Sequence, residues 1–266
     1  MSGRQFGNHD VTCSRMTAAH DPAENHLLRA LAGDGLERLI PDLEPVDLPL
    51  GRVLYESGDV LHYVYFPVDC IVSLLHVLAD GATAEIAIVG NDGLIGIALF
   101  MGGETTPDRA IVQSTGSAFR LPGQRLKDEF HRQGPLHDLL LRYTQSLITQ
   151  SLITQMAQTA VCNRHHPVDQ QLCRWLLLPL NRVPSNQIFM TQKLISSMPG
   201  VRPEGVTEAA GTLQLLGIIQ YQRGHITVLD RPKLETLCCK CYAVVERETD
   251  RLTPTRHKGA ARAVGA

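Results

Sequence analysis

The chain is 266 residues long, 44% hydrophobic and 20% charged, and its formal net charge at pH 7 is -2. This length and apolar content suit one large or two ordinary domains with packed cores, and they exclude a disordered, collagen-like or coiled-coil chain. No run approaches the roughly 18 apolar residues that cross a bilayer, and residues 1–25 lack the apolar core of a secretory signal, so we expect a cytoplasmic protein with no membrane partner.

The charge is unevenly divided along the chain. Residues 1–165 contain 12 Lys and Arg residues against 19 Asp and Glu residues, whereas residues 166–266 contain 13 against 8. A basic second half would attract a polyanion such as nucleic acid, because phosphate contacts supply most non-specific affinity. A chance division of surface charge is the alternative explanation.

The pattern of apolar and polar residues changes twice within the first 135 residues. Residues 1–24 are polar and aperiodic, which predicts a flexible tail. Apolar residues at helical spacing from Asn25 to Ile40 then predict one or two short helices that end before Pro41. Within residues 25–135, short apolar runs alternate with turn residues about every ten residues, which predicts an antiparallel roll, sandwich or barrel. The predicted strands are 52–55, 63–66, 71–78, 83–89, 110–115 and 119–121.

A long helix is predicted over residues 136–165, because residues 137–164 contain neither glycine nor proline. A helix of that length exceeds the needs of one small domain, so we expect it to pair with a second subunit. Its apolar residues recur at the spacing of a two-helix contact. They are Leu136, Leu140, Tyr143 and Leu147.

A tandem repeat interrupts this helix. Ser146–Gln150 is repeated directly as Ser151–Gln155. Five residues do not complete whole helical turns, so the apolar seam must restart at Leu152 and Met156 or the helix must absorb a bulge. We interpret the repeat as a duplication inside an interface helix, with chance similarity as the alternative.

Residues 166–245 carry the pattern of two short helices crossing over a turn. A buried amphipathic helix is predicted over residues 168–180. Thr191 is a plausible N-cap for a short helix that ends at Gly200, and Pro203 suits the first position of the next helix. The inward positions of that second helix are Val206, Ala210 and Leu213, which together predict a helix-turn-helix. Residues 218–221 and 226–229 predict a β-hairpin beside it, and residues 246–266 a flexible basic tail.

This order of parts resembles the Crp/Fnr family of bacterial transcription regulators over residues 25 to 245. The run Gly200-Val-Arg-Pro-Glu-Gly-Val-Thr-Glu208 lies where that family has its turn and recognition helix, and residues 217–228 lie where it has the wing. The resemblance implies an α+β fold with an N-terminal antiparallel β-roll of the cyclic-nucleotide-binding kind, a long dimerisation helix and a C-terminal winged helix-turn-helix. It further implies a homodimer that binds double-stranded DNA in a sequence-specific way to regulate transcription, with RNA polymerase as a further candidate partner.

The resemblance also assigns candidate DNA contacts. The best-known members have arginines where this chain has Pro203 and Glu208, so only Arg202 could make a bidentate guanine contact. Glu204 could accept a hydrogen bond from a cytosine amino group. The base-contact candidates are Arg202, Pro203, Glu204, Thr207 and Glu208, and the phosphate-contact candidates are Thr191, Gln192, Lys193, Arg223 and His225.

The family's effector pocket has a counterpart here that departs from the family pattern. Its residues would be Gly93, Gly96, Ile97, Arg109 and Ala110. Ile97 replaces the acidic residue that bonds the ribose, and Asp108 would oppose an anion, so cyclic AMP is disfavoured. We expect a degenerate pocket in which Arg109 pairs with Asp108, and an effector of unknown chemistry if one binds.

No metal or other cofactor is expected. The seven cysteines are an odd number and are predicted to be reduced thiols. Only Cys13 lies near the N-terminus, where iron-sulfur sensors of the Fnr type have a cluster. Cys238-Cys-Lys-Cys241, with His257 downstream, could bind zinc or sense oxidation, but adjacent cysteines do not match the usual C-x₂₋₄-C spacing. Asn163-Arg-His-His166 is predicted to be a surface helix end rather than a haem or metal site.

Two other classes of function remain open. No enzyme motif occurs in the sequence, and we expect a protein without catalytic activity. The first alternative is a small-molecule-binding module with a vestigial or protein-docking winged helix, which the acidic Glu204 and Glu208 would favour. The second is a thiol or metal sensor, which bound metal in the purified protein would reveal.

Overall fold

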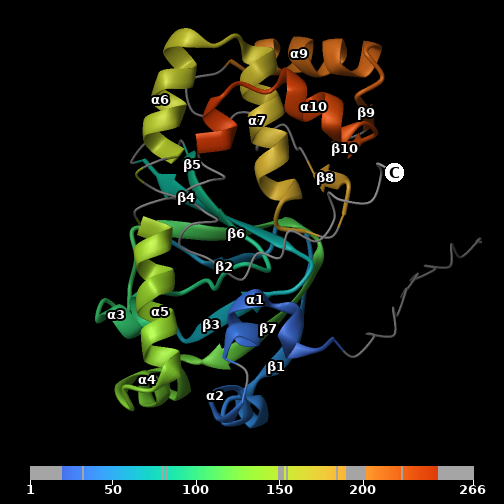
Figure 1. Cartoon of the computed structure of the whole chain (residues 1–266). Helices are drawn as coiled ribbons and strands as arrows, with labels where there is room; N and C mark the ends of the chain where they lie inside the picture. Colours follow the sequence, from blue (N-terminus) through green and yellow to red (C-terminus); the bar gives the residue numbers. More distant parts are fainter. Residues whose placement is uncertain are drawn as a thin grey trace, which may run out of the picture.

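The computed structural model describes residues 20–31, 33–78, 81, 83–148, 153, 155–183, 185–189, 202–222 and 224–244. An antiparallel β-roll lies at one end of the molecule and a helical part with a small sheet lies at the other, and a helical connector runs along one side of both (Figure 1). None of the helices in these ranges combines the length and apolar character that a bilayer crossing requires.

Two sheets packed face to face form the roll, and each of the six predicted strands is present. One sheet has four strands in the order β2-β6-β4-β5, the other has three in the order β1-β7-β3, and every pairing is antiparallel. Leu48 and Ala118 from one sheet meet Val72 and Val112 from the other in a common core. The strands are β1 (Glu44–Leu48), β2 (Val53–Tyr55), β3 (Tyr63–Pro67), β4 (Ile71–Val77), β5 (Thr83–Val89), β6 (Asp108–Ser114) and β7 (Gly116–Pro122).

Short helices close the ends of the roll. The two helices predicted before Pro41 are present, and two further helices flank the later strands. These elements are η1 (Pro22–Glu24), α1 (His26–Ala30), α2 (Asp34–Glu37), η2 (Ile40–Asp42), α3 (Ala98–Met101) and α4 (Gly123–His131).

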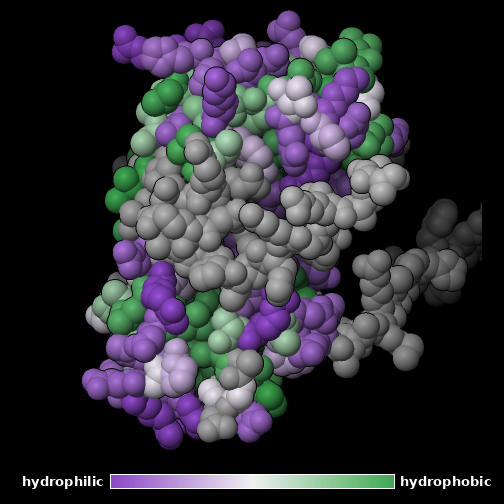
Figure 2. Space-filling view, in the orientation of Figure 1, coloured by the Kyte–Doolittle hydropathy of each residue, from purple (hydrophilic) through white to green (hydrophobic). Residues whose placement is uncertain are grey.

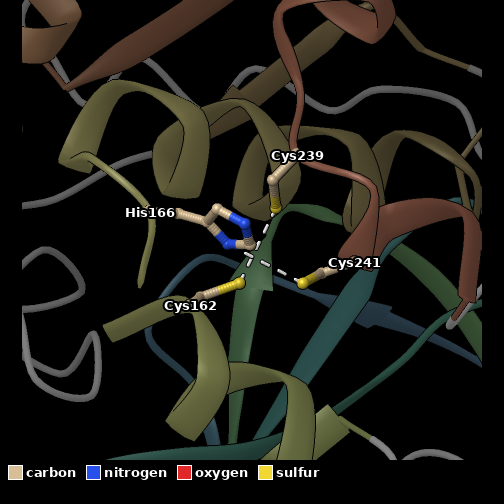
Figure 3. A group of neighbouring side chains, drawn as sticks. All are labelled: Cys162, His166, Cys239 and Cys241. Atoms are coloured by element: carbon tan, nitrogen blue, oxygen red, sulfur yellow. Dashed lines mark hydrogen bonds between the residues drawn. The ribbon is translucent and has the colours of Figure 1, made fainter. Parts of the chain in front are cut away.

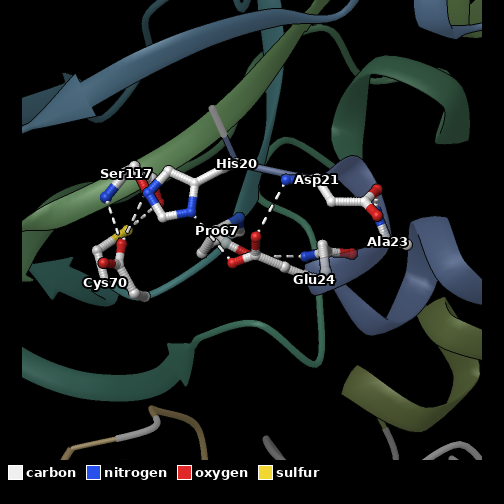
Figure 4. A network of polar contacts seen from close by, with 9 residues as sticks. His20, Asp21, Ala23, Glu24, Pro67, Cys70 and Ser117 are labelled. Carbon is white, nitrogen blue, oxygen red and sulfur yellow. Dashed lines mark hydrogen bonds and ion pairs between the residues drawn. The ribbon is translucent and has the colours of Figure 1, made fainter. Parts of the chain in front are cut away.

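Polar groups attach the first of these helices to the sheets (Figure 4). Asp21 and Glu24 form a capping box at η1, inside the segment predicted as a tail. The buried Asn25 accepts hydrogen bonds from the amides of α1, and its side-chain amide donates to the carbonyls of Pro67 and Gly93, each at 2.9 Å. Asn25 therefore ties α1 to the segment that follows β5.

The connector is divided into α5 (Pro135–Ser146) and α6 (Gln155–His165). Leu147, Ile148 and Ile153, which flank the junction of the two repeat copies, have the π-helical conformation of a bulged helix. Leu152 and Met156, where the seam was expected to restart, lie outside the residues whose side chains are described.

The apolar residues predicted to contact a second subunit contact the roll of the same chain, so that prediction is wrong. Leu136, Leu140, Tyr143 and Leu147 are at most 7% exposed and belong to the core of the roll. They therefore pack within the subunit, because the roll presents an apolar surface at the point where α5 passes it.

The second part of the molecule consists of α7 (Val168–Leu180), β8 (Gln187–Phe189), α9 (Pro203–Leu215), β9 (Ile219–Gln222), β10 (His225–Val228) and α10 (Arg231–Leu237). Its sheet has the order β8-β10-β9, with β9 and β10 forming the predicted hairpin. Helix α7 supplies more residues to the core than any other element, including Leu172 and Trp175. The first helix of the predicted helix-turn-helix, residues 191–200, lies outside the described residues.

The two parts also contact each other directly. Ile71 and Ile88 of the roll join the core that surrounds α7. The Arg182 guanidinium, which is 4% exposed, lies 3.3 Å from the Asp92 carboxylate. A Cβ at Gly90 would stand 2.6 Å from that of Arg182, so only glycine permits this approach.

Candidate DNA-reading surface and effector region

Helix α9 is held on its inner side by small and branched apolar residues. Val206, Ala210 and Leu213 are buried in the core around α7, as predicted. Arg202 is the N-cap and Pro203 occupies the first turn, where the missing amide hydrogen costs nothing. The opposite side of α9 is therefore fixed in orientation and faces away from the protein.

That outer side is polar over its first two turns. Arg202, Glu204, Thr207 and Glu208 are exposed, and Pro203 is half-buried. The Thr207 hydroxyl donates to the Pro203 carbonyl at 3.0 Å, so its oxygen faces outward as an acceptor. Hydrophilic side chains cover most of the upper edge of the molecule over α6 and α9 (Figure 2).

The predicted phosphate contacts are placed only in part. His225 is exposed at the start of β10, opposite Gln222 of β9, at the tip of the hairpin. Thr191, Gln192, Lys193 and Arg223 lie outside the described residues. Two carboxylates on the described face of α9 oppose a single arginine, so net attraction to phosphate would have to come from these flanking positions.

Two of the predicted effector residues, Gly93 and Gly96, are closely packed by other parts of the protein. The Tyr143 hydroxyl of α5 donates to the Leu94 carbonyl at 3.0 Å and accepts from the Leu94 amide at 3.1 Å. A Cβ at Gly93 would stand 2.4 Å from this hydroxyl, and one at Gly96, where φ is +101°, would stand 3.2 Å from the Tyr63 carbonyl. Both glycines are therefore required by the packing of the roll itself.

The expected Arg109–Asp108 pair is wrong. Neighbouring residues of a strand point to opposite faces, and Arg109 instead pairs with Glu56 at 2.5 Å. Asp108 lies 3.5 Å from His76 across the β4–β6 ladder. The arginine that would hold an anion is thus engaged by a carboxylate. Ala110 is fully buried, and the side chain of Ile97 is half-buried beside the roll's core.

A cavity lies elsewhere in the roll, between β2 and β3. Its volume is 390 Å³, and none of the five predicted effector residues lines it. Tyr55, Tyr63 and Tyr65 supply aromatic walls, and Asp59 and His62 supply polar groups. Burial raises the pKa of Tyr55, with Asp108 adding to the shift, so its hydroxyl is neutral over the physiological range.

A group of sulfur and nitrogen ligands lies at the end of α6 (Figure 3), where His166 is half-buried among cysteines and does not form the predicted surface helix end. Cys162, His166, Cys239 and Cys241 place one ligand atom each within 4.8 Å of one another, and we call them the Cys–His cluster. Cys162 lies 77 positions from Cys239, and His166 lies 75 positions from Cys241, so no local spacing motif joins these ligands. His257, which was predicted as a further candidate ligand downstream of Cys241, lies outside the described residues.

Comparisons with known proteins identify both parts. The model of the cyclic nucleotide-binding domain matches residues 45–133, and that of the Crp-like helix-turn-helix domain matches residues 170–237. Neither is the model of a catalytic domain. A search of curated protein sequences gives no match.

Solved structures share the fold at low sequence identity. FixK2 from Bradyrhizobium japonicum is 17% identical with a TM-score of 0.57, over 74% of this chain and 98% of that one. A CRP-family transcriptional regulator from Thermus thermophilus is 14% identical with a TM-score of 0.58, over 72% and 95%. The regulator CLP from Xanthomonas campestris is 15% identical with a TM-score of 0.55, over 73% and 97%. Because the two matched domains together span more than half of the chain, in the order found in this fold, the chain belongs to the Crp/Fnr family of transcriptional regulators.

Proposed function

We propose that the chain is a homodimeric transcription regulator that reads double-stranded DNA with α9 and contacts the backbone with the β9–β10 hairpin. The observation that carries this proposal is the two-sided character of α9. Its inner side is anchored on α7, and its outer side presents polar residues over the first two turns. A helix of this kind fits the major groove, whose base edges its N-terminal residues would contact.

The exposed residues suggest how a half-site would be read. Arg202 would donate two hydrogen bonds to the O6 and N7 atoms of a guanine. Glu204 would accept from a cytosine amino group, and the outward oxygen of Thr207 would accept a hydrogen bond from a base edge. A preference for G·C pairs within each half-site follows from this set.

A second apolar face of the connector supports a dimer. Leu141 and Ile148 are 39% and 43% exposed and lie seven residues apart, on the same side of the helix. Ile153 and Val161 extend the exposed apolar residues along the connector. Burial of this face against its copy in a second subunit would place two α9 helices on one side of the dimer, with RNA polymerase as the expected further partner.

The roll would bias the arrangement of these two helices through an effector other than cyclic AMP. The Xanthomonas regulator of similar fold is c-di-GMP responsive. In this chain Glu56 engages Arg109, the residue that would hold an anion, and the Tyr143 hydroxyl packs against the backbone of Gly93 and Leu94. Any effector must therefore displace these contacts or use the cavity between β2 and β3, and its differential affinity for the two arrangements would set the response.

Selection of bound fragments from random duplex DNA tests this function. Arg202→Ala should then weaken binding to the selected sequence by about 1 to 3 kcal/mol and weaken binding to unrelated DNA much less. Arg29→Ala is the matched control, since Arg29 is an exposed arginine on α1 of the roll. A purified chain that binds no duplex at low ionic strength would refute the proposal.

A further inference from the structure

The Cys–His cluster brings together two segments that are far apart in the sequence. Cys162 and His166 are one helical turn apart at the end of α6, and Cys239 and Cys241 follow α10. Three of the four side chains are buried and His166 is half-buried. The side chains converge on one point from both segments (Figure 3).

The distances within the cluster match a tetrahedral ion. The sulfur atoms of Cys162 and Cys239 are 3.7 Å apart, and the sulfur of Cys241 lies 3.8 Å from Nδ1 of His166. Ligands held about 2.3 Å (sulfur) and about 2.0 Å (nitrogen) from a zinc ion stand about 3.5 to 3.8 Å from one another. The widest separation in the cluster is within 4.8 Å, so an ion at the centre requires side-chain shifts of about 1 Å or less.

The surrounding residues hold the ligands in place. The buried Gln171 of α7 donates through one amide nitrogen to the carbonyls of Cys162 and His166, at 3.2 and 2.9 Å. This contact fixes the last turn of α6, from which both ligands project. Such outer contacts orient ligands in metal sites.

A buried cation beside the cluster, Arg174, has no ion-pair partner in the part of the chain that the structure describes. Arg174 is 6% exposed, and its Nε and one terminal nitrogen have no hydrogen-bond partner among the described residues, while the other terminal nitrogen donates to Thr159. Burial raises the pKa of Cys162 to about 12, and the positive charge of Arg174 opposes that rise. The guanidinium therefore lies close enough to favour a thiolate in the cluster. Three thiolates, a neutral imidazole and a divalent ion carry one net negative charge, which a single arginine would neutralise.

We propose that the Cys–His cluster binds one zinc ion in a closed structural site that cross-links the end of α6 to the segment after α10. Four protein ligands leave no open position for substrate, and a donor set of three sulfurs and one nitrogen is typical of structural zinc. On binding, the three thiols release their protons to solvent and the imidazole binds through Nδ1.

Metal analysis of the purified full-length chain tests the site directly. We expect about one zinc per chain, with no inorganic sulfide. Iron with inorganic sulfide would overturn the proposal, and so would a metal-free chain in which Cys162 and Cys239 form a disulfide.

Matched substitutions then locate the ion. Cys239→Ser and His166→Ala should lower zinc content and affinity by at least about tenfold. Cys238→Ser and His165→Ala, which change the adjacent residues outside the cluster, should retain the ion. Equal loss from the ligand and control variants would refute the assignment.

Cobalt provides a readout that needs no substitution. When the stripped, reduced wild-type chain is titrated with Co²⁺, we expect one equivalent to give thiolate-to-cobalt charge transfer and the strong visible bands of tetrahedral cobalt. Zinc should abolish both. Absence of these bands from a folded, reduced chain would rule out the site.

Hydrogen exchange tests the cross-link itself. Removal of the ion should accelerate amide exchange in α6 and in the segment after α10, and leave α5 unchanged because the roll holds it. Unchanged exchange in α6 after complete removal of a full equivalent of zinc would contradict the structural role. Neither this experiment nor the metal analysis depends on DNA binding, so the site can fail independently of the proposed function.

Discussion

The two halves of the connector are attached to the molecule by different chemistry. Helix α5 buries Leu140 and Tyr143 in the apolar core of the roll. In α6, Cys162 is the one buried side chain among those described, and Thr159 accepts a hydrogen bond from Arg174 of α7. Apolar burial is insensitive to metal and redox conditions, whereas thiols are sensitive to both. We therefore expect the attachment of α5 to the roll to be independent of metal and redox conditions, and the attachment of α6 to depend on both.

The largest expected effect comes from breaking the apolar attachment. Leu140 is 1% exposed, and Leu140→Ala should lower the free energy of unfolding by about 2 to 5 kcal/mol because it leaves a cavity between α5 and the roll. His165→Ala on α6, at an exposed site outside the Cys–His cluster, should change it by about 0.5 kcal/mol or less. Urea unfolding of both variants measures the difference, and equal losses would remove the contrast between the two helices.

A smaller effect is expected where a polar contact supports α5. Tyr143→Phe removes the hydroxyl that pairs with both backbone groups of Leu94, and leaving these buried groups unpaired should cost about 1 to 3 kcal/mol. Gly93→Ala should be destabilising alone and less so in the Tyr143→Phe background, because the new Cβ meets that hydroxyl. A double-mutant cycle measured by urea unfolding gives the coupling, and strict additivity would show that the two sites are independent.

A further effect, which depends on pH, concerns the direct contact between the roll and α7. Burial raises the pKa of Glu85 from 4.5 to about 7, opposed by hydrogen bonds from Ser73 and Trp175 and by the charge of Arg182. Between these pH values the folded chain retains a proton that the unfolded chain has released, so stability should fall as the pH rises from 4.5 to 7. Glu85→Gln should flatten this part of the profile. Thermal unfolding across the range checks it, and an unchanged slope in the variant would assign the titration to another group.

Sequence reasoning recovered most of the roll and missed particular elements for identifiable reasons. The strand β1 contains Glu44, Pro45 and Asp47, which disfavour strands in isolation, and it forms because β7 offers a complete antiparallel partner. The π-helical residues around the repeat follow from a local mismatch of five residues with whole turns and were foreseeable. The packing of the apolar residues of α5 against the roll could not be foreseen, because helical periodicity shows that one face of a helix is buried but does not show what covers it.

The candidate sites also include features that the sequence predicts and features that it does not. The exposed face of α9 could be predicted because period and capping act within a few residues. The hydrogen bond of Tyr143 with Leu94 joins residues that are 49 positions apart, and the pairing of Arg109 with Glu56 joins residues that are 53 positions apart, so neither could be predicted from local pattern.

The order of parts, six of the seven strands of the roll and the two-sided character of α9 were determined by the sequence alone, since each depends on neighbours along the chain. The Cys–His cluster was decided by the tertiary structure, because Cys162 and Cys239 are 77 positions apart and meet only when α6 and the segment after α10 pack together. Local periodicity carries no information about such a meeting, whereas the folded core brings both segments to the same place.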